Sequence, residues 1–330
     1  VVEWLAWHKS IGIQDIVVFT NDCTDGTDDL LDRLEEMGQL RHPPNPALAS
    51  GSSRFQPVAL SYTPYLSEFK RADFFISMDV DVTNISTALS QVETLANLKS
   101  GSYVCVSNVH MCMEVFDSSE FESVVNNADL VIPDGRPLSW AQKLLGHGKA
   151  EQVRGQDIMN AVCQQSGAKS LNIGLYGGSS DELLQQVIAE LKSSYPDINI
   201  TFSYSPPFRP LTDEEDLGII QKINDSNVNV LFVGIGCPKQ ERWMAEHKDQ
   251  LSCVMLGVGA AYDFIAGSKK HAPRWMQRVG LEWLFRLCSE PQRLWKRYLQ
   301  QNPRFIYYFT KQLINQKLGR NKITKGKENV

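Results

Sequence analysis

Polar side chains that could do chemistry follow several apolar runs of this 330-residue chain. Asp134 is the clearest case, because it comes just after the apolar residues 130–132 and stands between a proline and a glycine. A carboxylate held there could act as a general base, although an ordinary turn is the commoner explanation for such an aspartate taken alone. Ser107 and Asn108 follow residues 103–106 in the same way. They could hydrogen-bond ligand hydroxyl groups or simply cap a helix.

Three further junctions place glycines where an apolar run gives way to a helical pattern. Gly177 and Gly178 precede a helical pattern that begins at Asp181. Glycines let a backbone approach a ligand closely, and a helix N-terminus attracts anions. The acidic residues in that first turn nevertheless oppose a phosphate lying directly on the helix dipole. The other two junctions, at residues 234–241 and 257–264, combine small residues with polar groups at a helix start.

The elements that would position these junctions are predicted by strand and helix patterns that alternate along the chain. Apolar runs predict buried strands at residues 16–19, 74–78, 103–106, 130–132, 171–175, 228–233 and 254–258. Helical patterns include residues 158–165, 181–193, 239–247, 275–288 and 292–301. The alternation indicates an α/β fold with a mainly parallel sheet. Ligands of open α/β sheets bind at the carboxyl ends of the strands, so the junctions could converge on one crevice.

The composition excludes several classes of protein. With 42% hydrophobic and 22% charged residues, the chain is neither disordered nor collagen-like and can form one large or two modest domains. No apolar run approaches the roughly 20 residues that a spanning helix needs, which excludes an integral membrane protein. The seven scattered cysteines argue against a zinc site and a disulfide framework. No signal segment opens the chain, which favours the cytoplasm, and its start at Val1 inside an amphipathic pattern suggests a fragment.

Charge is distributed very unevenly along the chain. From Ser268 onward there are fifteen Lys and Arg against three Asp and Glu, a net charge of +12, whereas the preceding residues carry eighteen against thirty-five, a net of −17. Arg286, Arg293 and Arg297 recur at spacings of seven and four among many aromatic residues, so they could share one side of a helical pair. Such a surface could lie on an anionic membrane and bind a diphosphate, or it could be a solvated face over an aromatic core. Nothing resembles a nucleic-acid recognition module.

The first eighty residues contain a second group of motifs. Residues 21–27, N-D-C-T-D-G-T, follow a predicted strand and resemble the loop of family 2 glycosyltransferases of the GT-A type. Asp79 and Asp81 then form a D-x-D that could hold Mg²⁺ or Mn²⁺ on a nucleotide diphosphate. Helix caps and a turn are the stronger explanation of the same residues, and the rest of such an enzyme is missing. This segment therefore looks like a partial GT-A domain.

Four motifs in the remainder of the chain are specific when taken together. They are V-I-P-D-G around Asp134, G-C-P-K-Q-E-R-W from Gly236, G-V-G-A-A-Y-D-F-I-A-G from Gly257, and A-P-R-W-M-Q-R-V-G-L-E-W-L-F-R from Ala272. In order and spacing they resemble the WecG/TagA/CpsF family, glycosyltransferase family 26, over about residues 80–318. The resemblance implies a Rossmann-like sheet with helices on both faces. It also implies inverting transfer of N-acetylmannosamine, or a related hexose or uronic acid, from a UDP-sugar to a polyprenyl-diphosphate-linked sugar.

The resemblance also implies roles for particular residues. Asp134 matches the proposed base. Residues matching the family's substrate-binding segments are Ser107, Asn108, Arg154, Gly177, Gly178, Gln240, Tyr262 and Asp263. Contacts to the diphosphate and the membrane would come from Arg274, Arg278, Arg286, Arg293 and Arg297. Arg154 and Arg136 depart from the residue types usual in the family, which suggests a donor with an extra negative charge.

The sequence thus predicts a peripheral enzyme at the inner face of the membrane, which uses a UDP-sugar and no cofactor or metal. We expect a partial GT-A segment (1–80), a catalytic domain (81–267), a basic helical appendage (268–318) and a flexible tail (319–330). Self-association into a homo-oligomer remains open, and no nucleic-acid partner is expected. Two alternatives also remain open: metal-dependent transfer by the N-terminal segment through Asp79 and Asp81, and a non-catalytic protein that binds UDP-sugars or membrane surfaces.

Overall fold

The computed structural model of the chain describes residues 71–318, except for the side chains of residues 71–75, Arg274 and Arg278. The chain divides into two compact units, Val1–Lys70 and Arg71–Val330. The predicted strand at residues 16–19 and the GT-A-like loop at residues 21–27 lie outside the described residues, as does the predicted tail at 319–330.

The centre of the second unit is a six-stranded sheet in which every strand pair is parallel. In spatial order the strands are β4 (Leu130–Pro133), β3 (Ser102–Ser107), β8 (Val254–Gly257), β7 (Val230–Gly234), β5 (Asn172–Gly177) and β6 (Asn199–Tyr204). The four central strands are almost entirely buried, as expected for apolar runs covered on both faces. The predicted Rossmann-like α/β fold is confirmed.

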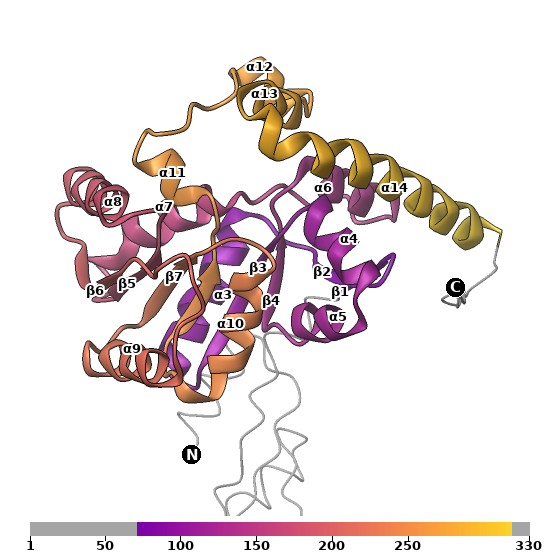
Figure 1. Cartoon of the computed structure of the whole chain (residues 1–330). Coiled ribbons are helices and arrows are strands. Elements are labelled where there is room, and N and C mark those ends of the chain that lie inside the picture. Colours follow the sequence, from indigo (N-terminus) through magenta and orange to yellow (C-terminus); the bar gives the residue numbers. More distant parts are fainter. Residues whose placement is uncertain (1–70, 319–330) are drawn as a thin grey trace, which may run out of the picture. The chain divides into compact units, whose positions relative to one another are not determined.

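Helices cover both faces of this sheet and form a separate hydrophobic core with each (Figure 1). One core includes residues of α4 (Val109–Asp117), α5 (Ser119–Asn126), α9 (Asp213–Asp225) and α10 (Lys239–His247). The other includes residues of α3 (Ile85–Leu98), α7 (Gly155–Ser166), α8 (Asp181–Ser194) and α11 (Ala261–Ile265). Successive side chains of a strand point to opposite faces, so Tyr103 and Cys105 belong to the first core and Val104 and Val106 to the second.

One strand prediction is wrong and one strand was missed. The run at residues 74–78 is not one strand, because the chain turns at Ile76 and Ser77 to form an antiparallel hairpin of β1 (Arg71–Phe75) and β2 (Met78–Asp81). Ile76 adopts φ 64°, a left-handed conformation that is strained for a β-branched residue. Because this position is not a glycine, the sequence does not indicate the turn. The edge strand β6 was missed because it contains no apolar run and is partly exposed.

The basic appendage, residues 268–318, is helical, with different helix boundaries from those predicted. The single helix expected at residues 275–288 is two helices, α12 (Arg274–Arg278) and α13 (Glu282–Ser289), separated at Gly280, which adopts φ 75°. The last helix, α14 (Pro291–Lys317), is much longer than predicted and continues through Pro303. Within residues 71–318, no helix is both long enough and apolar enough to cross a bilayer.

Polar contacts attach α14 to the catalytic body along its length. His110 Nδ1 lies 2.7 Å from Gln301 Oε1, and Arg304 donates two hydrogen bonds to Asp117. Near the end of the helix, Gln312 Oε1 accepts a hydrogen bond of 3.0 Å from the backbone N–H of Ile76. The appendage is therefore docked on the α4 side of the sheet and on the hairpin (Figure 1).

Candidate active site

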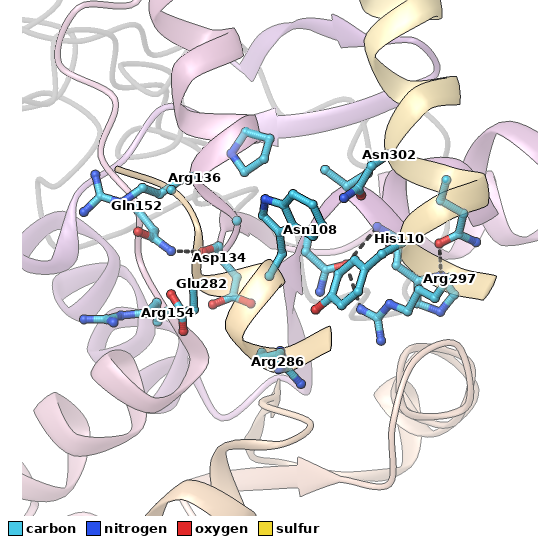
Figure 2. Close-up of a pocket in the computed structure, with 17 residues that line it drawn as sticks. Asn108, His110, Asp134, Arg136, Gln152, Arg154, Glu282, Arg286, Arg297 and Asn302 are labelled. Carbon is cyan, nitrogen blue, oxygen red and sulfur yellow. Dashed lines mark hydrogen bonds between the residues drawn. The ribbon is translucent and has the colours of Figure 1, made fainter. Parts of the chain in front are cut away.

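A cavity of about 110 Å³ lies between the carboxyl end of β4 and the appendage (Figure 2). We call it the aspartate cavity. The body contributes the starts of α4, α6 (Arg136–Leu144) and α7, while the appendage contributes residues of α13 and α14. Its charged and polar lining residues are Asn108, His110, Asp134, Arg136, Gln152, Arg154, Glu282, Arg286, Arg297, Tyr298, Gln301 and Asn302.

Asp134 is held firmly at the end of β4. Its backbone N–H donates to the Ser107 carbonyl at 2.7 Å, and its own carbonyl accepts from Gln152 Nε2 at 2.6 Å. The side chain accepts one hydrogen bond, from the Gly155 N–H, at 3.3 Å. Burial and the nearby negative charge of Glu282 raise the pKa of Asp134 to about 6, against the opposing effects of Arg286, Gly155 and Arg154. The carboxyl group can therefore accept a proton near neutral pH.

Asn108 and Ser107, predicted together, have different surroundings. Asn108 caps α4, because its Oδ1 accepts from the N–H groups of His110 and Met111, and it also lies 3.4 Å from Arg297 Nη2 in the aspartate cavity. Ser107 is fully buried, and its hydroxyl donates to the Ile132 carbonyl. Of these two residues only Asn108 lines the cavity, and Ser107 joins β3 to β4.

His110 is a cavity residue that the sequence did not reveal. Its ring is hydrogen-bonded to Gln301, which in turn donates to Glu114. Burial, together with the positive charge of Arg297, lowers the pKa of His110 to about 4. The imidazole is thus neutral at physiological pH and adds no charge beside Arg297.

The arginines predicted to act together are distributed over two places. Arg286 and Arg297 line the aspartate cavity with Arg136, and the Nε atom of each of these three is buried with no hydrogen-bond partner among the described residues. Arg293 pairs with Glu290 and lines a different cavity. The side chains of Arg274 and Arg278 lie outside the described residues.

Arg154 already has two partners in this structure. Its Nε donates to Asp157 and its Nη1 donates to Gln277 of α12, both at 2.8 Å. The second bond ties the start of α7 to the appendage. Asp157 offsets the charge of Arg154. Both Arg154 and Arg136, the two residues expected to bind an extra anionic group of the donor, line the aspartate cavity.

A second and larger cavity, of about 670 Å³, lies at the carboxyl ends of β5, β7 and β8. We call it the glycine cavity, since Gly178, Gly236 and Gly259 line it, all with positive φ. Gly177, beside it, tolerates no side chain, because a Cβ would lie 2.6 Å from the Gly234 backbone. The lysines and arginines that line this cavity, among the described side chains, are Arg209, Lys239, Arg242, Lys269 and Arg293.

Three residues predicted to face the donor lie at or beneath this cavity. Tyr262 is almost fully buried with its ring against Gly234, and its hydroxyl donates to the Phe232 carbonyl. Asp263 lines the cavity and pairs with Lys269 at 2.8 Å. Gln240 is buried, accepts from the Gly236 N–H and donates to Glu241. Gln240 thus holds the loop at residues 235–238, which we call the glycine loop, whereas Tyr262 and Asp263 contribute to the cavity wall.

Asp81 has a role inside the fold. Its Oδ2 accepts a hydrogen bond of 2.7 Å from the Val131 N–H, which fastens β2 to β4, and only 5% of the residue is exposed. The Asp79 N–H donates to Asn126 in the same region. Among residues 71–318, no group of three or more His, Cys, Asp or Glu side chains could hold a metal ion.

The chain matches a known family over most of its length. The model of the "Glycosyl transferase WecG/TagA/CpsF family" matches residues 74–319, which include both cavities and the docked appendage. The chain belongs to this family. The resemblance drawn from the four motifs is confirmed, and the protein is a glycosyltransferase.

Two relatives from Bacillus carry the same name, N-acetylglucosaminyldiphosphoundecaprenol N-acetyl-beta-D-mannosaminyltransferase. The protein of Bacillus spizizenii strain W23 is 26% identical over 224 residues, which are 67% of this chain and 84% of the relative. That of Bacillus subtilis strain 168 is 28% identical over 203 residues, 61% of this chain and 76% of the relative.

Proposed function

We propose that this glycosyltransferase moves N-acetylmannosamine, or a related hexose or uronic acid, from a UDP-sugar to a polyprenyl-diphosphate-linked sugar with inversion. The observation that carries the proposal is that Asp134, at the end of β4, lines one cavity together with Arg286 and Arg297 of the appendage. The names of the two Bacillus relatives support the acceptor and the sugar. The product would enter teichoic acid or surface polysaccharide synthesis.

In this proposal the two cavities hold the two substrates. The glycine cavity takes the UDP-sugar, because its glycines leave room for a diphosphate and Lys239, Arg242, Lys269 and Arg293 can offset its charge. The aspartate cavity takes the acceptor, with Arg286 and Arg297 on the lipid diphosphate. Helix α14 lines both cavities through Arg293 and Arg297, and therefore connects the two sites.

The reaction then needs one proton transfer. Asp134 removes the proton from the acceptor hydroxyl as that oxygen attacks the anomeric carbon from the side opposite UDP. The bond from the anomeric carbon to the UDP oxygen breaks, and the developing charge on UDP is stabilised by the preorganised lysine and arginine side chains. Displacement from the opposite side inverts the anomeric configuration.

A donor screen tests this function. Purified protein is given a short-chain polyprenyl-diphosphate-N-acetylglucosamine and a set of UDP-hexoses, UDP-N-acetylhexosamines and UDP-uronic acids, and products are analysed by mass spectrometry and NMR. We expect one donor to be strongly preferred and its sugar to be transferred with inversion. Binding of UDP without transfer from any donor would favour the non-catalytic alternative. Strict Mn²⁺ dependence that disappears in Asp79→Ala would favour the metal-dependent alternative.

The outer face of α14 supports peripheral attachment to an anionic membrane at the cytoplasmic side. Leu294, Phe305 and Phe309 are buried against the body, while Leu299 and Ile306 on another side of the helix are 60% and 63% exposed. Exposed apolar side chains also include Trp295, Ile314 and Leu318, and the same helix carries Lys296, Lys311 and Lys317. An amphipathic helix with an exposed apolar stripe and lysines is typical of a helix that lies in the membrane interface.

The double substitution Leu299→Glu with Ile306→Glu is expected to weaken binding to vesicles of phosphatidylglycerol and phosphatidylcholine at least tenfold. Burial of each side chain is worth about 1.5–3 kcal/mol, which the charged replacements remove. Vesicle co-sedimentation measures the effect, and Leu217→Glu on α9, also 62% exposed in the native chain, is the matched control. Unchanged vesicle binding with a shift from dimer to monomer would show instead that this face contacts a second copy.

A further inference from the structure

We infer that Glu282 of the appendage acts on Asp134 through its charge and thereby makes the aspartate a stronger base when the appendage is docked. Glu282 is then a positioning residue of the transfer reaction. The inference rests on the proposed role of Asp134 as the base, and it concerns a residue that the motifs do not single out for any chemistry.

The packing between the body and the appendage places Glu282 in the aspartate cavity. Helix α6 starts two residues after Asp134, and its Trp140 lies against Gly280, where an added Cβ would come within 2.4 Å of the indole ring. Helix α13 starts directly after this contact, with Glu282 as its first residue. The tight approach at Gly280 therefore fixes the start of α13 beside the β4–α6 junction.

Figure 2 shows the resulting group of charged side chains, with Glu282 near Asp134, Arg154 and Arg286. Asp134 and Glu282 both line the cavity and influence each other electrostatically. Among the described side chains, none forms an ion pair with Asp134 within 4.0 Å, and its carboxyl group accepts a hydrogen bond from the Gly155 N–H. None of the described cations is therefore bound directly to Asp134 beside Glu282.

Glu282 lies at a position in its helix where a negative charge is favoured. It stands in the first turn of α13, where the helix dipole favours an anion. Arg286 follows four residues later on the same helix, and Arg154 faces the pair from the start of α7. Among the described side chains, the remaining charged or titratable groups around the cavity are Arg136 of α6, Arg297 and Tyr298 of α14, and His110 of α4, which is neutral near pH 7.

A fixed negative charge next to a carboxyl group opposes its ionisation, so the proton affinity of that carboxyl group rises. Burial contributes most to the raised pKa of Asp134, and Glu282 comes second. With a pKa of about 6, Asp134 is still ionised at pH 7 but binds a proton more tightly than an ordinary aspartate. General-base catalysis is most efficient when the pKa of the base lies near the working pH. An undocked appendage would leave Asp134 the weaker base.

The pH dependence of kcat in Glu282→Gln tests the inference. Loss of the charge lowers the pKa of Asp134, so we expect the midpoint of the acid limb to fall by about one pH unit. The plateau above pH 7 should fall several-fold, because the base is weaker. Glu282→Asp keeps the charge and should keep the acid limb close to that of the unmodified enzyme. Glu190→Gln, an exposed residue of α8, is the matched control.

Carboxyl ¹³C NMR of aspartate-labelled protein gives a readout that needs no substrate. The Asp134 signal is identified by its absence in Asp134→Asn, and its titration midpoint should fall in Glu282→Gln. An unchanged midpoint in both measurements, with kcat reduced equally at every pH, would overturn the inference and indicate a direct contact with substrate or a structural role. Full activity in Asp134→Asn would instead show that the proposed base is wrong, so the two failures are distinguishable.

Discussion

Asp134→Asn is expected to reduce the rate of sugar transfer by about 10²–10⁴-fold, the usual contribution of a positioned general base. Asparagine has nearly the same shape and can still accept the hydrogen bond from the Gly155 N–H, so the β4–α6 junction should remain intact. The amide cannot take a proton from the acceptor hydroxyl. Binding of UDP, measured by calorimetry, should change less than twofold, because the glycine cavity does not include this residue.

The role of Asp134 as the base also predicts how the activity of the unmodified enzyme depends on pH. Since Asp134 must be ionised to act, activity should fall as the pH decreases through about 6. Asp225→Asn, at the exposed end of α9, controls for the loss of a carboxylate as such. Full activity in Asp134→Asn, with the acid limb unchanged, would assign proton transfer to another group.

Glu241→Gln is expected to stabilise the protein at pH 8 by about 3 kcal/mol. Glu241 is fully buried in α10, and burial raises its pKa from 4.5 to about 7 despite hydrogen bonds such as that from Gln240. A raised carboxyl pKa means that the folded state is favoured below about pH 4.5 and that this stability is lost as the pH rises through 7. A difference of about 2.5 pH units corresponds to about 3 kcal/mol, which the neutral amide recovers.

Thermal unfolding at several pH values measures this effect. At pH 8 the melting temperature of Glu241→Gln should exceed that of the unmodified protein by about 5–10 °C, and the difference should disappear near pH 4.5. Glu190→Gln, whose carboxyl group is exposed, should show no such pH-dependent gain. A variant that is less stable at pH 8 would mean that the charge of Glu241 is needed to hold Gln240 and the glycine loop.

The features that the sequence predicted correctly are mostly local. The helix at residues 239–247 was predicted with its actual bounds. Asp134 was placed at a strand end by its neighbours alone. The central strands were recognisable because parallel strands buried on both faces are continuously apolar.

The parts that were not predicted depend on contacts between distant segments. His110 and Gln301 are separated by 191 positions in the chain, so no pattern around His110 could reveal its place in the cavity. Glu282 lines the same cavity as Asp134 because the appendage packs on the body, where Gly280 lies against Trp140. Gln240 fell in a motif and was expected to face a ligand, but its amide is directed into the loop beneath the glycine cavity. Motifs identify residues near a site without saying which way they point.

The hairpin at residues 71–81 determines where a minimal catalytic fragment can begin. The sequence suggests a domain start at residue 81, but Met78 and Val80 are fully buried, and Gln142 donates hydrogen bonds to the carbonyls of Val80 and Asp81. A fragment that begins at residue 81 would expose part of the core and lose the bond between Ile76 and Gln312. Expression of the catalytic unit alone should therefore start at Arg71, where the two compact units meet in the chain.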